Sequence, residues 1–264
     1  MKKFNRPIAP WLHIAVILSS VLFAGVVGRS CTQAAFDSGQ RMLTPTSDYE
    51  AQLDRIADND PALSKFRAAF PAEWLSFRAA MATDVKSSMS LEELKRRSAD
   101  RMRSFMISNI DLTASAPVAE LNEMLSAERE FVEYLANHGP LLCAQYGMAG
   151  LSGTETLSTT GIGLMTEVAI LRLNATQRGR DQPEKYGTLT ADDANDLMSG
   201  MRNNGASSTV VSMMMTDASV GTPDEQCEGT LAIYRAIDRM PDAQAARVYS
   251  VILRAAAEQN TGSP

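Results

Sequence analysis

The segment from Ile8 to Val27 constrains this chain most, because it runs for twenty residues without an Asp, Glu, Lys or Arg. A helix rises about 1.5 Å per residue, so a helix of this length spans about 30 Å, the thickness of the hydrocarbon layer. Three basic residues precede the segment, and positive charge marks the cytoplasmic end of a membrane helix: Lys2, Lys3 and Arg6. We therefore expect contact with the lipid bilayer through residues 8–27, in the inner (cytoplasmic) membrane as a single pass, with the N-terminus inside and the rest in the periplasm.

Three interpretations of this segment compete: an uncleaved anchor, a cleaved signal peptide and a lipoprotein. Its apolar run exceeds the 7–15 residues of a signal peptide, which favours an uncleaved anchor. Small residues at Thr32 and Ala34 would nevertheless allow cleavage as a signal peptide. A lipoprotein modified at Cys31 is the other alternative, although Arg29 stands where lipoproteins carry small or aliphatic residues. Residues 1–28 are assigned to a cytoplasmic tip and anchor, or a signal peptide, and residues 29–46 to a tether.

Residues 47–260 read as one α-helical domain. Helix start signals recur along it, such as Asp60-Pro61 and Thr222-Pro223-Asp224-Glu225, in which side chains satisfy the free N–H groups of the first turn. Apolar residues recur at helical rather than alternating spacing, and the run from Ile162 to Leu173 is apolar on all sides, typical of a central helix. The fold class is therefore all-α: an irregular bundle of seven to nine helices behind one N-terminal transmembrane helix.

The charge distribution excludes one class of partner. Residues 1–30 hold four basic residues and no acid, so the remainder carries a net charge of −10. An acidic domain lacks the positive footprint that displaces counterions from nucleic acid, so no nucleic-acid partner is expected.

Two of the three cysteines lie in the predicted domain, at Cys143 and Cys227. In an oxidising compartment buried thiols form disulfides, and a Cys143–Cys227 bond would close a loop of about 85 residues. On the chain-entropy model such a bond contributes roughly 4–5 kcal/mol. The spacing matches neither a zinc motif nor a C-x-x-C redox pair, and two unrelated buried thiols are the alternative.

Histidine chemistry has little support. His13 lies in the anchor, and His138 precedes the Gly139-Pro140 break, where a helix C-terminus favours a positive charge. A histidine-based metal site or a Ser-His-Asp triad is therefore not expected, and we assign no metal and no cofactor.

The stretch Gly161–Thr166 resembles the Gly-Leu-Met-Gln stretch of lytic transglycosylases, which cleave peptidoglycan. In that family a catalytic glutamate followed by serine stands well upstream, whereas here the only candidate is Glu155-Thr156, which is too close. The alternative interpretation is a glycine-punctuated helix start in the core. Glu167, on the predicted central helix, would have a raised pKa if buried; pairing with an arginine or exposure to solvent is the alternative.

Two further side-chain groups have a structural and a functional interpretation. Five methionines lie close together in the sequence: Met198, Met201, Met213, Met214 and Met215. Their thioethers would suit a soft metal ion, but methionine more often fills a hydrophobic core, which is the favoured interpretation. Five basic residues form a run: Lys95, Arg96, Arg97, Arg101 and Arg103. They could contact an anionic lipid or an envelope polymer, but a solvated helix face, with Glu93–Arg97 as an i,i+4 pair, is favoured.

These observations favour a non-enzymatic role in the cell envelope, in which the domain binds another protein or assembles with itself as a homo-oligomer. No catalytic residue is assigned. The alternatives are a carboxylate-based peptidoglycan hydrolase acting through Glu155 or Glu167, and a small-ligand sensor or binding module.

Overall fold

The computed structural model describes residues 47–87, 90–151 and 155–261, and this part of the chain is helical without a strand. It contains twelve α-helices and one 3-10 helix: α3 (Ser47–Asn59), α4 (Pro61–Ala69), α5 (Pro71–Lys86), α6 (Leu91–Ser108), α7 (Ile110–Thr113), α8 (Val118–His138), α9 (Pro140–Ala149), α10 (Thr159–Asp181), α11 (Ala191–Asn203), α12 (Ser208–Thr216), η1 (Ala218–Val220), α13 (Pro223–Asp238) and α14 (Asp242–Thr261). The all-α fold class is confirmed. The expected number of helices was too low for the described residues.

The helix between residues 140 and 149 accounts for part of this difference. The Gly139-Pro140 pair was read as a stop, and Gly139 does end α8, at a φ of 148° that favours glycine. Pro140 then serves as the first residue of α9, because proline lacks the N–H that a first turn leaves unpaired anyway. The pair is therefore both a stop and a start, and it turns the chain between two helices.

Side-chain caps fix several helix starts where the sequence predicts them. The Asp60 carboxylate accepts a hydrogen bond of 2.8 Å from the Leu63 amide at the start of α4. At α13, Thr222 and Glu225 form a reciprocal capping box, as their spacing predicts. Each of these caps satisfies backbone N–H groups that the first turn of a helix leaves without a partner.

A second capping box begins α11 and also links this helix to α14. Thr190 and Asp193 cap each other, and the Asp193 carboxylate receives hydrogen bonds of 3.1 and 2.6 Å from Arg247. Burial alone would raise the pKa of Asp193, but the bonds from Arg247 and Thr190 outweigh it and lower the pKa to about 2. The Asp193 carboxylate is thus held ionised although its side chain is almost fully buried.

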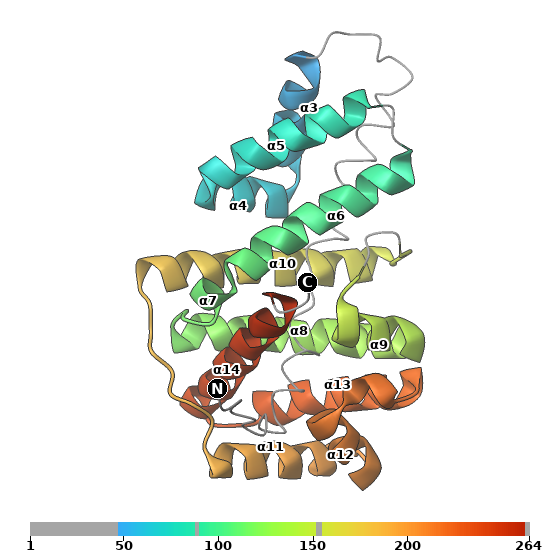
Figure 1. Cartoon of the computed structure of the whole chain (residues 1–264), viewed down its shortest axis with the longest axis vertical. Coiled ribbons are helices and arrows are strands. Elements are labelled where there is room, and N and C mark those ends of the chain that lie inside the picture. Colours follow the sequence, from blue (N-terminus) through green and yellow to red (C-terminus); the bar gives the residue numbers. More distant parts are fainter. Residues whose placement is uncertain (1–46, 88–89, 152–154, 262–264) are drawn as a thin grey trace, which may run out of the picture.

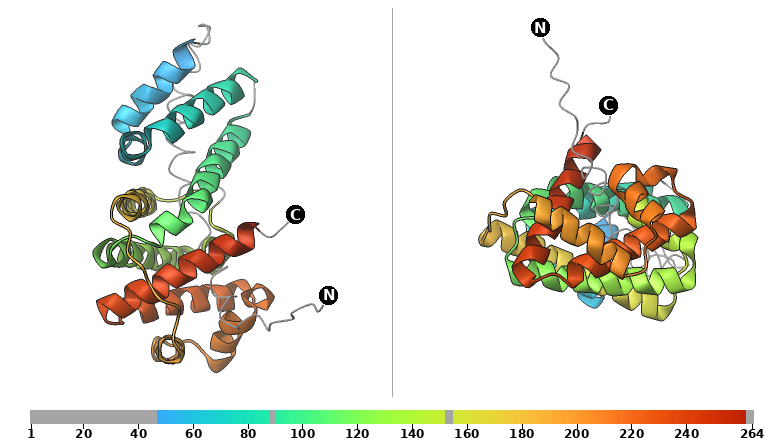
Figure 2. Two further views of the ribbon diagram at one scale, coloured as in Figure 1. Left: turned by 60° about the vertical axis from the view of Figure 1, so that its left-hand side comes forward. Right: turned by 90° about the horizontal axis from the view of Figure 1, so that it is seen from below.

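The helices stack along the long axis of the molecule (Figure 1). Helices α3, α4 and α5 form one end, and α11 and α12 form the other, as the second view also shows (Figure 2). Between them α8 packs against α9, α10, α13 and α14, while α10 also contacts α4 and α7. The expected central position of the 162–173 run is therefore correct, since α10 joins the α3–α5 end to the rest of the core.

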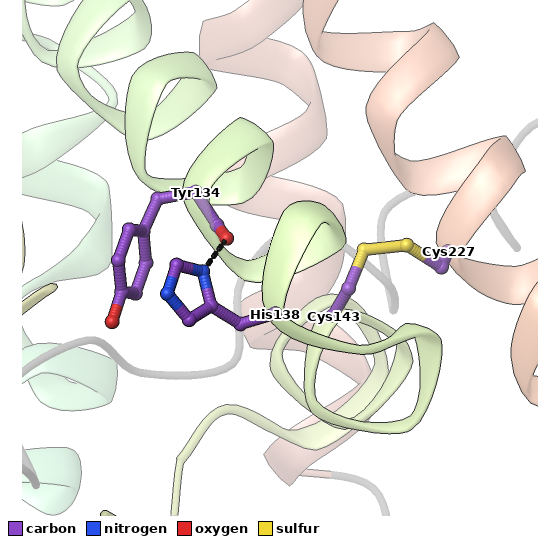
Figure 3. The surroundings of a disulfide bond; sticks show 4 residues. All are labelled: Tyr134, His138, Cys143 and Cys227. Carbon is purple, nitrogen blue, oxygen red and sulfur yellow. Dashed lines mark hydrogen bonds between the residues drawn. A yellow bond between two sulfur atoms is a disulfide. The ribbon is translucent and has the colours of Figure 1, made fainter. Parts of the chain in front are cut away.

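Cys143 of α9 and Cys227 of α13 form the expected disulfide, with an S–S distance of 2.08 Å and a Cα–Cα distance of 5.2 Å (Figure 3). Both residues are buried, and they are separated by 84 positions in the sequence. The bond therefore connects two helices that lie side by side but form far apart along the chain.

Of the helices in the described ranges, none has the length and apolar character needed to cross a membrane. The predicted anchor at 8–27, the tether at 29–46 and Cys31 lie outside those ranges.

Candidate functional site

The two carboxylates considered for hydrolysis, Glu155 and Glu167, have different surroundings. Glu167 is exposed on α10, so it reaches solvent, as the second of its two interpretations predicts. Glu155 is half-buried before α10 and accepts a hydrogen bond of 2.6 Å from the Gln145 side chain. Neither carboxylate lines the large cleft described below.

His138 occupies the last turn of α8, close to the disulfide (Figure 3). Its Nδ1 lies 2.7 Å from the carbonyl oxygen of Tyr134, and its ring centroid lies 3.9 Å from the Tyr134 ring. A carbonyl oxygen only accepts, so Nδ1 carries the hydrogen. The side chain is exposed and engaged with its own helix end, which agrees with the expected end-of-helix role.

The methionines belong mainly to the core. Met201 and Met214 are fully buried, and Met213 is 9% exposed. Met198 and Met215 are half-buried and pack against the same apolar cluster. The core-filling interpretation therefore accounts for all five.

A buried ionic centre that sequence reasoning missed lies where α8, α10, α13 and α14 meet. Glu128 of α8 is 0% exposed and Arg172 of α10 is 3% exposed, and their side chains form an ion pair. The other carboxylate oxygen of Glu128 accepts hydrogen bonds from the hydroxyls of Tyr234, at 2.7 Å, and Tyr249. One carboxylate thus joins four helices.

The electrostatics of this centre follow from burial. Burial raises the pKa of the Tyr146, Tyr234 and Tyr249 hydroxyls well above their usual value, and the negative charge of Glu128 raises it further. For Arg172, burial alone would lower the pKa, but the attraction of Glu128 outweighs it and raises the pKa. The tyrosines are therefore neutral donors and the arginine a permanent cation.

This centre is closed to substrates, because the residues that surround Glu128 are themselves buried. Its Oε atoms are engaged by a cation and two hydroxyls, so no oxygen faces solvent. We assign it to the structure of the domain rather than to chemistry on a ligand.

The α5–α6 cleft is the candidate binding site. It has a volume of about 910 Å³ and lies between the first half of α5 and nearly the whole length of α6. Its lining residues are Phe66, Ala72, Glu73, Ser76, Phe77, Arg96, Arg97, Asp100, Arg101, Met102, Ser104, Phe105, Ser108 and Asn109. Residues 96–109 extend for about 20 Å along a helix, so the cleft is elongated. Such a volume is within the usual range for small-molecule sites.

Three members of the basic run line one wall of this cleft, so the run is more than a solvated face: Arg96, Arg97 and Arg101. Arg96 and Arg97 both bond to Glu93, and Arg97 makes the expected i,i+4 contact at 3.0 Å. These bonds lower the pKa of Glu93 to about 2, which keeps it ionised. The remaining two basic residues point to other partners: Lys95 pairs with Glu92, and Arg103 bonds to Asp100 and the Leu151 carbonyl.

A buried carboxylate holds the two inner arginines in place. Asp84 of α5 is 4% exposed and accepts hydrogen bonds from Arg97, at 3.2 Å, and from Arg101. The two arginines therefore share one carboxylate at the end of the cleft where the last turn of α5 lies beside α6.

Comparison with known protein families, with curated proteins and with solved structures finds no match for this chain.

Proposed function

We propose that this chain is a non-enzymatic binding protein of the cell envelope, which takes up a small ligand in the α5–α6 cleft. The observation that carries the proposal is the cleft itself, whose lining includes Phe66, Phe77 and Phe105 as well as Arg96, Arg97 and Arg101. Small-molecule sites combine a mainly apolar lining with a few polar groups that fix orientation.

The exposed surface favours a small ligand over an extended protein interface. The large apolar side chains exposed in the described residues lie on three separate elements: Leu75 on α5, Leu141 on α9 and Val220 on η1. A protein interface gathers such side chains into a continuous apolar centre. Binding of a protein partner or a second copy, which the sequence alone favours, is therefore kept as an outcome of the test below.

The hydrolase alternative has less support from the described residues. Glu167 faces solvent, Glu155 is engaged by Gln145, and Glu128 is closed off by its partners. Most glycoside hydrolases use two carboxylates that face one another across the bound sugar. Neither sequence-derived candidate stands at the cleft where a polymer strand would lie.

A cleft-blocking substitution tests the proposed function. Ser104 is exposed on α6 and lines the cleft, so Ser104→Trp would fill it, whereas Ser212→Trp places the same side chain on the exposed face of α12. The full chain and both variants are purified from membranes under native conditions, and the bound small molecules are extracted and weighed by mass spectrometry. We expect small molecules to accompany the wild type and Ser212→Trp and to be depleted from Ser104→Trp.

Two results would contradict this proposal. Equal recovery of small molecules with Ser104→Trp would remove the cleft as their site. Recovery of a protein partner alone, unaffected by Ser104→Trp, would favour the protein-interaction role through another face.

We further propose the location that the sequence predicts: residues 8–27 hold the chain in the inner membrane, and the helical domain lies in the periplasm. The Cys143–Cys227 bond supports an oxidising compartment, because cytosolic thiols are kept reduced. Intact cells are treated with a membrane-impermeant maleimide, with and without prior reduction. Labelling of Cys143 and Cys227 only after reduction is the expected result; labelling without reduction, and only after lysis, would overturn both the location and the disulfide.

A further inference from the structure

Two arginines stand at the end of the α5–α6 cleft where its two helices meet: both pair with Asp84, and Arg97 also pairs with Glu93. The short connection between Lys86 and Leu91 makes α5 and α6 consecutive antiparallel neighbours, and the bonds from Arg97 and Arg101 to Asp84 mark where they meet. In the described residues, the hydrogen bonds of Arg101 all run through Nη1, to Asp84 and to the Met81 sulfur. A guanidinium has five N–H donors, so this arginine has donors left for a ligand.

An aromatic floor begins one helical turn further along. Phe105 follows Arg101 by four residues, so both lie on one face of α6, about 6 Å apart along the helix axis. Phe66 sits at the centre of the floor, with its ring centroid 4.9 Å from that of Phe105 and 6.1 Å from that of Phe77. Phe66 and Phe77 are only 1% and 6% exposed, so the half-buried Phe105 offers most of the accessible ring surface, next to Arg101.

The opposite end of the cleft carries a negative charge. Glu73 is exposed in the first turn of α5, eleven residues before Asp84, which corresponds to about 16 Å along the helix. A second acidic group of a ligand would meet this carboxylate. Asp100 also lines the cleft, but it is engaged by Arg96 and Arg103. The remaining donors of Arg101, beside Arg97, therefore give the position for an anion, and an apolar surface leads away from it.

We infer that the cleft binds an organic anion with a single acidic group and an apolar body, an inference that rests on the proposed function. The acidic group pairs with Arg97 and Arg101, whose positions Asp84 fixes. The apolar body lies along α6 on the half-buried Phe105 ring, which the buried Phe66 ring supports from the core. The class includes aromatic and aliphatic carboxylates, sulfonates and phosphates with one apolar substituent.

Two matched probes test this ligand class. Naphthalene-1-sulfonate carries the ring and the anion, and naphthalene-1-sulfonamide replaces the anion by a neutral group of similar shape. Each is titrated into the full chain in a nonionic detergent by isothermal titration calorimetry, against a detergent blank. We expect the sulfonate to bind one-to-one and about tenfold tighter than the sulfonamide, because a charged hydrogen bond is stronger than a neutral one.

Substitutions separate the two parts of the site. Arg101→Gln should weaken sulfonate binding about tenfold and leave sulfonamide binding nearly unchanged, since it removes one cation from the anion position. Arg202→Gln on α11 is the control, because Arg202 is exposed and the change in net charge is the same. If Arg101→Gln does not fold, Arg97→Gln serves instead, because the Arg97 side chain is 41% exposed, lines the cleft and is the other cation of the anion position.

Equal affinity for the two probes, or equal losses in Arg101→Gln and Arg202→Gln, would overturn the inferred ligand class. Failure of both probes to bind would overturn it as well. The proposed function would survive these results if Ser104→Trp still depleted the native small molecules, so the two failures are distinguishable.

Discussion

The buried ion pair between Glu128 and Arg172 makes a quantitative prediction about stability. In Glu128→Gln the shape of the side chain is kept, but Arg172, which is 3% exposed, loses its anionic partner. Breaking a buried pair from one side costs about 3–5 kcal/mol, because a charge is left without compensation. A domain is typically stable by about 5–15 kcal/mol, so this one substitution should remove a large share of the free energy of unfolding.

A double variant identifies the cause of that loss. Urea unfolding of the full chain, followed by far-UV circular dichroism, gives the free energy of unfolding for the wild type, Glu128→Gln, Arg172→Met and the double variant. The glutamine oxygen still accepts from Tyr234 and Tyr249, and methionine has no charge to leave unpaired. We therefore expect the double variant to be more stable than Glu128→Gln alone by at least about 1 kcal/mol. A double variant as unstable as the sum of the two single losses would refute the argument from uncompensated charge.

Three further predictions test other parts of the fold. Cys143→Ala should lower the free energy of unfolding by roughly 4–5 kcal/mol in oxidising buffer, and it should equal the wild type in stability under reduction. An unchanged urea midpoint without reductant would contradict the disulfide. Gly179→Ala should lower the free energy of unfolding by about 1–3 kcal/mol, because its Cβ would lie 1.8 Å from the Leu112 carbonyl oxygen. Gly163→Ala on the same helix meets open space and should raise the free energy of unfolding by about 0.5–1 kcal/mol. Equal effects of the two substitutions in urea unfolding would count against this close contact of α7 and α10. Folding lowers the pKa of the Asp193 carboxylate from 3.8 to about 2, so its contribution of roughly 2 kcal/mol to stability is present above pH 4 and is lost as the pH falls toward 2. The urea midpoints of the wild type and Asp193→Asn should therefore converge over that range. A constant difference between the two midpoints would contradict the assigned ionisation.

Local signals in the sequence predict much of the fold. The Thr222 and Asp60 caps act within three residues, so spacing alone identifies them. The apolar run at 162–173 predicts a central helix because a helix without a polar face needs neighbours on all sides. Gly139-Pro140 was harder, since the same two residues can end one helix and begin another, and only the chain that follows decides.

The ionic centre and the cleft were missed because they form between helices. Glu128 reaches Arg172, Tyr234 and Tyr249 across 44, 106 and 121 positions, and no local spacing encodes those distances. One signal was present in the sequence: Glu128 falls on the apolar stripe of its helix, seven residues after Leu121. A charged residue at such a position indicates a buried charge that needs a partner.

The basic run illustrates a different limit of sequence reasoning. Its i,i+4 pair with Glu93 follows from helical spacing, and that contact is present. The feature that turns the run into a candidate site is Asp84 on the preceding helix, which gathers Arg97 and Arg101 at one end of the cleft. Nothing in the spacing of α6 indicates that partner, because it depends on how α5 and α6 pack.

The placement of the restraints in the fold suits a binding role for the α5–α6 cleft. The disulfide joins α9 to α13, and the Glu128 centre joins α8, α10, α13 and α14, so both lie away from the α3–α5 end (Figure 1). The cleft wall on α5 is instead held by aromatic contacts of Trp74 and Phe77 with Phe66 of α4, and by the ion pairs of Asp84 with Arg97 and Arg101 of α6. Local opening takes least free energy where few buried restraints cross between elements. The spacing of α5 and α6 is therefore set by neither the disulfide nor the Glu128 centre, which is the arrangement that we expect of a cleft that adjusts to a ligand.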